Sequence, residues 1–353
     1  MEELTVRRDR LAQRGAPRLL WAPVLLWALA GLAAAGCSDV KDSLEEADKT
    51  LSGALTGEDA AEFEGLTGTA LSDALYDSGL RLQSEGRDED AFRRFLQAAE
   101  RGHGPAAYEL GEAYNAGRGA DQDLNAGAKW INEAAARGEP RAQYAVGAAL
   151  YNGAGVAQDY VRAAEYLTAA AEQGHADAQF LLGECYANGR GVTKNLAWAA
   201  RWYGKAAEQG HPDGAFSFGV VQAAGLGLPT NMTAGYAWLD IAAQRGHRQA
   251  GDVRAAIANK MTPAQLEAGK RRAQGFEPAG AADFADKPTV MYVQHSLNQL
   301  GFNAGAVDGL MGPRTRSAIA AYLSSRGEGG EAALTPDLVQ KLFEGQQAAT
   351  PAA

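Results

Sequence analysis

The fold is decided by residues 176–211, which read ADAQFLLGECYANGRGVTKNLAWAARWYGKAAEQGH. Four columns of this segment, each of one chemical character, return every 36 residues along the middle of the chain. These columns are Gly111, Gly147, Gly183 and Gly219; Gly119, Gly155, Gly191 and Gly227; Trp130, Tyr166, Trp202 and Trp238; and the alanine pairs 134/135, 170/171, 206/207 and 242/243. Independent columns in one register predict a stacked array of a single structural unit.

The unit reads as two helices joined by a glycine-rich loop. Apolar residues fall at helical spacing between Ala142 and Asn152. Glycine accepts the left-handed backbone of a helix C-cap, so we expect the helix to stop at residues 153–155, with Gly155 at positive φ. Asp159 then supplies a preferred N-cap for the second helix, and Gly174 ends it. The sequence therefore predicts an all-α solenoid of helix hairpins.

The repeat resembles the Sel1-like repeat, which is related to the tetratricopeptide repeat. The third unit carries the resemblance at Ala178, Leu182, Gly183, Tyr186, Gly189, Gly191, Val192, Trp202, Ala206 and Ala207. The fourth departs from it at Gln222 and Leu228. The likeness covers roughly residues 70–250 and implies a helical scaffold that binds a partner protein. Residues 70–105 form a variant first repeat, and 249–258 and 262–274 read as capping helices, so we place the solenoid at 69–274.

The N-terminal region has the pattern of a secretory signal peptide at residues 1–36. Five arginines precede an apolar run from Leu19 to Gly36, which ends in small residues directly before Cys37. This junction resembles a bacterial lipobox, although Ala34 stands where that family usually has leucine. The resemblance implies that Cys37 is lipidated. Ordinary cleavage after the Ala-x-Ala sequence and an uncleaved anchor are the alternatives. Residues 37–68 are rich in acidic side chains and read as a flexible tether.

The C-terminal region reads as a linker at 275–288, a small domain at 289–345 and a flexible tail at 346–353. Helical patterns at 290–300, 313–325 and 336–343 predict a three-helix module. It resembles the peptidoglycan-binding type 1 domain through Val293, Gln294, Leu297, Leu300, Gly301, Phe302, Asp308, Gly309, Gly312, Thr315, Arg316, Ala318, Ile319 and Tyr322. Leu323 and the long stretch 324–333 depart from that family.

The resemblance implies a set of peptidoglycan-binding residues in this module. They are Asp308, Gly309, Gly312, Thr315, Arg316 and Tyr322. A second interpretation fits the Asp308-Gly309 pair, because aspartate followed by glycine is also a turn sequence. In that case Asp308 bonds nearby backbone, and Thr315 and Arg316 brace the following helix.

A second set of candidates lies on the first helices of the repeats, where equivalent positions vary in sequence. These partner-binding candidates are Glu109, Glu112, Leu181, Glu184, Ser217 and Val220. The first helix usually lines the concave face of a solenoid, so variation there suits a surface for one partner. A solvated face without a partner is the alternative.

Composition and spacing argue against several function classes. A net charge of −10 disfavours nucleic-acid binding, which relies on clustered Lys and Arg. His103, His175, His211 and His247 recur by repeat position, too far apart to converge on one metal ion. Cys185 sits in a column of small apolar residues, which predicts a buried, inert thiol. We expect no metal, no cofactor and no catalytic residues.

The sequence thus favours a non-catalytic adaptor of the bacterial cell envelope. Lipid would hold one end in a membrane, the C-terminal module would bind peptidoglycan, and the solenoid would bind an envelope protein. Ser38 after the cysteine favours the outer membrane, facing the periplasm. The alternatives are a regulatory subunit that docks or activates a separate cell-wall hydrolase or synthase, and a hydrolase with an unrecognised site.

Overall fold

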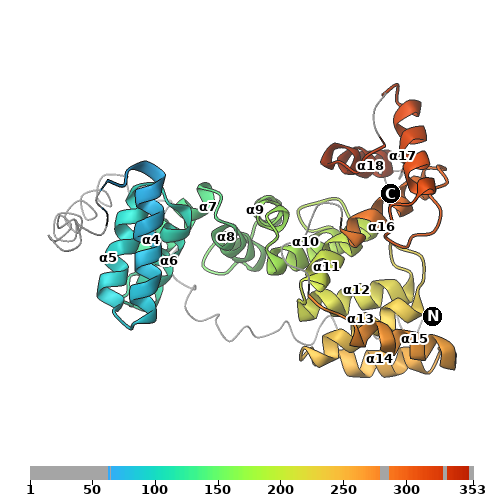
Figure 1. Cartoon of the computed structure of the whole chain (residues 1–353), viewed down its shortest axis with the longest axis horizontal. Helices are drawn as coiled ribbons and strands as arrows, with labels where there is room; N and C mark the ends of the chain where they lie inside the picture. Colours follow the sequence, from blue (N-terminus) through green and yellow to red (C-terminus); the bar gives the residue numbers. More distant parts are fainter. Residues whose placement is uncertain (1–62, 64, 279–285, 329–331, 350–353) are drawn as a thin grey trace. The chain divides into compact units, whose positions relative to one another are not determined.

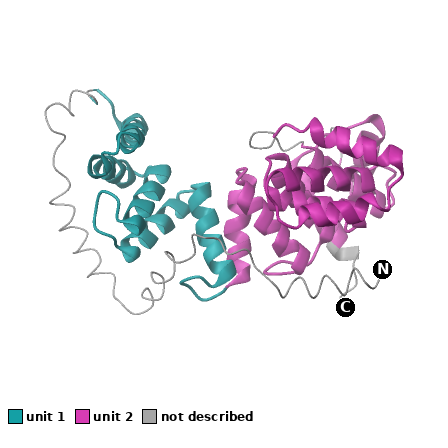
Figure 2. Cartoon of the chain, turned by 90° about the horizontal axis from the view of Figure 1, so that it is seen from below, with its two compact units in different colours: residues 1–158 teal, residues 159–353 magenta. Residues whose placement is uncertain are grey.

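The computed structural model describes residue 63 and residues 65–278, 286–328 and 332–349. Every regular element in this part of the chain is an α-helix, which confirms the all-α prediction. The chain divides into two compact units, residues 1–158 and 159–353 (Figure 2). Cys37, the signal-peptide segment and the acidic tether lie outside the described residues.

Within the described residues, the first unit contains five helices arranged as successive hairpins. They are α4 (Gly68–Ser84), α5 (Asp88–Glu100), α6 (Gly104–Ala116), α7 (Leu124–Ala136) and α8 (Pro140–Asn152) (Figure 1). Helices α4 and α5 form the variant first repeat that the sequence predicts at 70–105. Its core is built around Leu75, Phe92 and Phe95, each about 1% exposed.

The second unit continues the repeats and adds the C-terminal helices. The repeat and capping helices are α9 (Tyr160–Glu172), α10 (Ala176–Asn188), α11 (Leu196–Glu208), α12 (Pro212–Ala224), α13 (Met232–Gln244), α14 (Ala250–Ala258) and α15 (Pro263–Gln274). The C-terminal module consists of α16 (Lys287–Gln299), α17 (Pro313–Ser325) and α18 (Pro336–Ala349). Helix α16 begins three residues before the predicted start of its helical pattern at 290.

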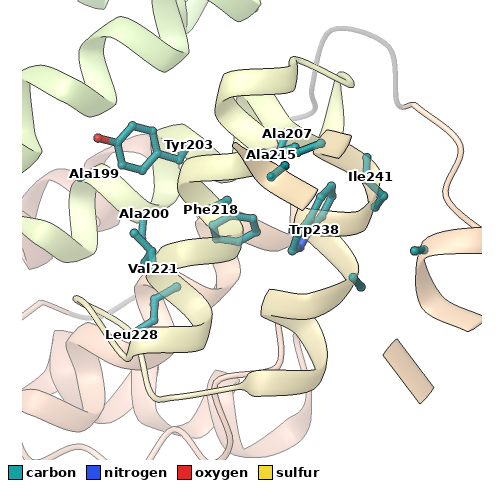
Figure 3. Close-up of a cluster of buried hydrophobic side chains, with 14 residues drawn as sticks. Ala199, Ala200, Tyr203, Ala207, Ala215, Phe218, Val221, Leu228, Trp238 and Ile241 are labelled. Carbon is teal, nitrogen blue, oxygen red and sulfur yellow. The ribbon is translucent and has the colours of Figure 1, made fainter. Parts of the chain in front are cut away.

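Small residues allow the repeat helices to pack closely. Figure 3 shows the core of the second unit, where Phe218 and Trp238 lie among alanines from α11 and α12. A Cβ atom added to Gly183 would lie 2.6 Å from the ring of Tyr203. The glycine column at this position is therefore required by helix-to-helix contact, as the sequence predicts. Leu228 departs from the repeat pattern yet is 4% exposed and fills the same core.

The helix ends follow the predicted caps with one correction. Asp123, Asp159, Asn195 and Asn231 each accept hydrogen bonds from backbone N–H groups of the following helix. The C-cap of α8, however, is Gly153 at φ 66°, and Gly155 at φ 74° lies beyond it in the loop. The predicted stop at residues 153–155 and the positive φ of Gly155 are therefore confirmed, but the residue that caps the helix is Gly153 and not Gly155. The first glycine of each loop ends the helix. The second lies further along the loop, where in the third and fourth repeats it approaches the backbone of the preceding repeat.

Candidate functional sites

The loop between α16 and α17 is organised around one buried amide. Gln294, which is 2% exposed, donates from Nε2 to the Asp308 carboxylate at 2.9 Å and to the Leu310 carbonyl at 3.0 Å. Its Oε1 accepts the backbone N–H groups of Asp308 and Gly309 at 3.0 and 2.9 Å. Several hydrogen bonds to one buried side chain fix the shape of this loop, because leaving any of these groups unpaired would be costly.

Asp308 has the contacts of a turn residue. Its Oδ1 accepts the N–H of Leu310 at 2.9 Å as well as the Gln294 amide. Gly309 follows at φ 77°, the left-handed region that glycine tolerates. The hydrogen bond from Gln294 and that from the Leu310 backbone lower the pKa of Asp308, so it is a carboxylate at neutral pH. The side chain is nevertheless exposed, so turn geometry does not remove it from solvent.

The other five residues of the predicted peptidoglycan-binding set divide by exposure. Thr315 is 2% exposed and Tyr322 is 4% exposed, and Gly309 is also buried. Thr315 donates weakly to the carbonyls of Ala304 and Leu310, at 3.3 and 3.4 Å. Tyr322 donates to the carbonyl of Lys341 at 3.0 Å. Gly312 is the N-cap of α17, and Arg316 is exposed. Within this set, Asp308 and Arg316 therefore have the exposed side chains.

The C-terminal module packs directly on the third repeat, through contacts that the sequence interpretation missed. Helix α16 lies beside α11 (Figure 1). The ring of Trp198 meets Tyr292 of α16 at 4.6 Å and Phe343 of α18 at 4.8 Å, measured between ring centroids. A Cβ atom at Gly204 would lie 2.7 Å from Pro288, so the two helices approach closely there. The module is held against the solenoid by a buried aromatic contact.

Two buried cations complete this interface. Arg201 is 5% exposed, lies between the rings of Trp198 and Trp202, and donates to the Thr289 hydroxyl at 3.0 Å. Lys205, also 5% exposed, forms an ion pair with Asp286. Burial lowers the pKa of both cations, and Asp286 opposes that shift. Removing one member of such a pair leaves a buried charge without its counter-charge, which typically costs about 3–5 kcal/mol.

The carboxyl group of Glu208, close to this ion pair, also has a shifted pKa. Burial, together with the nearby Asp286 carboxylate, raises the pKa of Glu208 to about 7. Lys287, Lys205 and Arg272 act in the opposite direction. At neutral pH the interface therefore contains a carboxyl group that is only partly ionised.

A signal for this interface is present in the repeat alignment. Trp198 stands in the column Ala126, Arg162, Trp198, Ala234, and Lys205 stands in the column Glu133, Ala169, Lys205, Ile241. Arg201 likewise has no arginine counterpart in its own column. The third repeat is thus distinguished at three positions of its second helix, on the face that contacts the module. The predicted partner-binding residues lie on the first helices of the repeats, whereas this face belongs to a second helix.

In the first unit, the partner-binding candidates have intramolecular contacts. The Glu109 carboxylate accepts from Arg141 at 2.6 Å, and its side chain is 13% exposed. Arg141 also lies over the ring of Tyr108, 4.5 Å from its centroid. Glu112 accepts a long hydrogen bond of 3.5 Å from Asn115. These glutamates lie on α6 and help to hold the surface together as well as contributing charge to it.

In the second unit, the candidates lie half-buried on α10 and α12. Glu184 accepts a short hydrogen bond from the Tyr203 hydroxyl, which fixes its direction. Leu181 lies on the same helix, and Ser217 and Val220 lie on α12. Each of these side chains retains some exposed area. They remain candidates for contact with a partner.

Three of the four repeat-position histidines act as helix caps, whereas the N-cap of α14 is Gln249 and not His247. The Nδ1 atoms of His103, His175 and His211 accept backbone N–H groups at 3.1, 3.3 and 3.0 Å, which requires an unprotonated Nδ1. The Nε2 atom of His211 lies 3.0 Å from Asp177 of the preceding repeat. Nowhere in the described ranges are three His, Cys, Asp or Glu side chains grouped closely enough to hold a metal ion.

Two further residues can be placed. Cys185 is fully buried, and burial raises the pKa of its thiol to about 12, so the predicted buried thiol is confirmed. His295 of α16 is half-buried, and burial lowers its pKa. In the part of the chain that the structure describes, none of the helices combines the length and apolar character needed to cross a membrane.

Comparison with family models identifies both parts of the chain. The Sel1 repeat model matches residues 104–139, 140–175, 176–211 and 215–247. The family described as "Putative peptidoglycan binding domain" matches residues 286–325. A comparison with curated proteins finds no match.

Solved structures give similar scaffolds. A protective antigen of uropathogenic Escherichia coli with an SLR fold is 28% identical, at a TM-score of 0.50, over 58% of this chain. This chain covers 45% of that antigen, less than half of its length. A Sel1 repeat protein from Oxalobacter formigenes is 22% identical at a TM-score of 0.49, over 69% of this chain and 98% of its own.

Proposed function

Because this chain carries four Sel1 repeats and a peptidoglycan-binding domain near its C-terminus, we propose that it is a non-catalytic adaptor of the bacterial cell envelope. The repeats indicate protein–protein interaction, and the C-terminal domain indicates peptidoglycan binding and an association with the cell envelope. In the proposed role, the module binds the wall while the solenoid presents a surface to one envelope protein. The observation that carries the proposal is the presence of both binding modules in one chain.

The packing of the module on the third repeat supports an adaptor with defined geometry. Trp198 and Tyr292 form an aromatic contact, and the Lys205–Asp286 ion pair fixes the start of α16. A module held in this way transmits a fixed orientation from the wall to the repeats of the second unit. A module on a loose tether would only raise the local concentration of its partner.

Two measurements on the full chain test the proposal. The protein is expected to co-sediment with purified peptidoglycan sacculi, and crosslinking in intact cells is expected to capture a specific envelope protein. Replacing Leu181 and Val220 with glutamate should abolish that capture, because both lie on the proposed partner surface. Arg162→Glu, on the exposed surface of α9, is the matched control and should leave capture intact.

The outcomes separate the adaptor from other roles. Failure of the folded chain to sediment at any sacculus concentration would remove the wall-binding half of the proposal. Capture that persists in the glutamate variants would remove the proposed partner surface. A crosslinked wall hydrolase or synthase whose rate changes on binding would identify a regulatory subunit instead. Zymography of the purified protein tests the non-catalytic part, because a cleared band would contradict it.

The proposed lipid anchor rests on the N-terminal sequence. The apolar run before Cys37 and the small residues at its end have the anatomy of a lipoprotein signal. Cys37→Ser should block lipid attachment and move the protein from the membrane fraction to the soluble fraction. The check is membrane fractionation together with intact-protein mass. A variant that fractionates like the parent would contradict the anchor without affecting the wall-binding proposal.

A further inference from the structure

Packing on the third repeat decides which face of the C-terminal module can meet the cell wall. Pro288, Thr289 and Tyr292 of α16 are buried, with Tyr292 fully so. Phe343 of α18 lies against Trp198. The aromatic face of the module is therefore occupied by the solenoid. A wall ligand has to use another surface.

The surface that remains is the loop before α17 and the start of that helix. Helix α17 packs against α16, and its main helix contact within the described residues is with α16. Leu310 is 60% exposed, the largest value among the exposed large hydrophobic residues in the described part of the chain. Asp308 and Arg316, on either side of it in the sequence, are also exposed. An exposed leucine that lies between two exposed charged residues in the sequence offers a ligand both apolar area and polar groups that fix its orientation.

The loop presents this surface in a fixed shape. Gln294 holds Asp308, Gly309 and Leu310 through their backbone groups and through the Asp308 carboxylate. Both hydrogen bonds to the Asp308 carboxylate use its Oδ1 atom, and the residue is exposed. A loop fixed before binding loses little conformational entropy when a ligand arrives.

The charge of this region differs from that of the whole chain. Residues 301–327 contain Arg314, Arg316 and Arg326 with Asp308 as their acidic residue, in a protein of net charge −10. Arg326 pairs with Glu328 at 3.6 Å, so the excess positive charge comes from Arg314 and Arg316 at the start of α17. Guanidinium groups pair with carboxylates in a bidentate manner. In peptidoglycan, carboxylates are concentrated on the peptide stems, whereas the repeating sugars are mostly neutral. The charge of the segment therefore favours the peptide over the glycan.

Resting on the proposed wall binding, we propose that Asp308, Leu310 and Arg316 form the wall-contact surface and that they bind the carboxylate-bearing peptide stem of peptidoglycan. The exposed large hydrophobic residue of the described module is an aliphatic leucine, and the rings of Tyr292 and Tyr322 are buried. Sugar rings are usually held by stacking on exposed aromatic rings. Leu310 instead offers an apolar contact to alkyl parts of the stem, and Arg316 pairs with its carboxylate.

The experiment measures binding of the full chain to three probes. The probes are intact sacculi, the soluble peptide-free glycan strands that an amidase releases from them, and a soluble disaccharide-tetrapeptide fragment. The double variant Leu310→Ala/Arg316→Ala should weaken binding to intact sacculi and to the fragment by about tenfold or more, as expected for central contact residues. The matched control is Val161→Ala/Arg162→Ala, which removes an exposed aliphatic residue and an exposed arginine from α9. It should bind like the parent.

Each outcome bears on the proposal separately from wall binding itself. If the parent chain binds no probe, the proposed function fails. If the parent binds intact sacculi but the double variant binds equally well, this surface is wrong while wall binding stands. Binding of the parent to the peptide-free glycan strands as tightly as to the disaccharide-tetrapeptide fragment would show that the glycan is the ligand and would overturn the peptide assignment. Melting temperatures of both variants verify that the exposed substitutions leave the fold intact.

Discussion

Two glycines of each repeat loop share a backbone conformation but meet different surroundings. In the third repeat, Gly189 has φ 71° and Gly191 has φ 72°. A Cβ atom at Gly189 would lie 3.3 Å from the Cβ atom of Lys194, so this neighbour would have to shift by only a few tenths of an ångström. At Gly191 it would overlap the backbone carbonyl of Tyr160, at the start of the preceding repeat's second helix. The second glycine is therefore required because successive repeats are in contact at this position.

This difference gives a prediction at the scale of one residue. Gly189→Ala should destabilise the protein by about 1–2 kcal/mol, the cost of placing an L-residue in the left-handed region. Gly191→Ala should cost more than about 4 kcal/mol, because backbone atoms must separate as well. Chemical denaturation of both variants checks the order. Equal losses would show that the loop does not contact the neighbouring repeat as described.

At the scale of the helix, histidine caps link the stability of the solenoid to pH. His103 caps α6 through an unprotonated Nδ1, and its Nε2 lies 3.3 Å from Asp73. Burial lowers the pKa of His103 and of His247 below the ordinary value of 6.5. At pH values between the lowered pKa of the folded state and the ordinary pKa of 6.5, these histidines bind more protons in the unfolded chain than in the folded chain. The stabilisation is therefore complete above pH 6.5 and is lost as the pH falls towards the folded pKa.

The corresponding prediction uses a cap that does not titrate. The stabilising contribution of His103 should decrease as the pH falls from about 7.5 to 5.5, while the raised pKa of Glu208 acts in the opposite direction, equally in the parent and in a His103 variant. Asparagine is also a preferred N-cap residue, so His103→Asn should keep the cap, and its free energy of unfolding relative to that of the parent should rise over this range. His247 still titrates in this variant, so part of the slope should remain. If the free energy of unfolding of His103→Asn depends on pH in the same way as that of the parent, His103 does not contribute to the pH dependence.

At the scale of the whole molecule, the decisive feature of the second unit is the interface between α11 and α16. Trp198 is 7% exposed and contacts both Tyr292 and Phe343. The nearby ion pair of Lys205 with Asp286 is buried on both sides. An aromatic contact reinforced by a buried ion pair is expected to keep the module attached in solution, because separation would expose both.

Trp198→Ala should therefore loosen the module. Replacing a buried tryptophan with alanine typically costs about 3–5 kcal/mol. Hydrogen exchange should become faster in α16 and α18 together, since both lose the same contact. Trp130→Ala in α7 of the first unit is the control and should leave exchange in α16 unchanged. Continued protection of α16 in Trp198→Ala would mean that this contact does not hold the module.

The sequence by itself determined the helix-hairpin repeat, the residues that cap its helices, and the resemblance of the C-terminal module to a peptidoglycan-binding domain. Cap residues and glycines act through bonds to their immediate neighbours, so Asp159 and Gly174 could be assigned from local spacing. The glycine columns that recur every 36 residues also predicted where adjacent helices pack closely, as at Gly183.

Only the tertiary structure decided where the module packs and which of its residues are exposed. The contact of Trp198 with Tyr292 joins positions 94 residues apart, and no local periodicity encodes such a pairing. Likewise, Thr315 and Arg316 are adjacent in sequence, yet one is buried in the Gln294 network and the other faces solvent. Burial depends on the direction of a side chain within the packed module, which residue type and spacing do not specify.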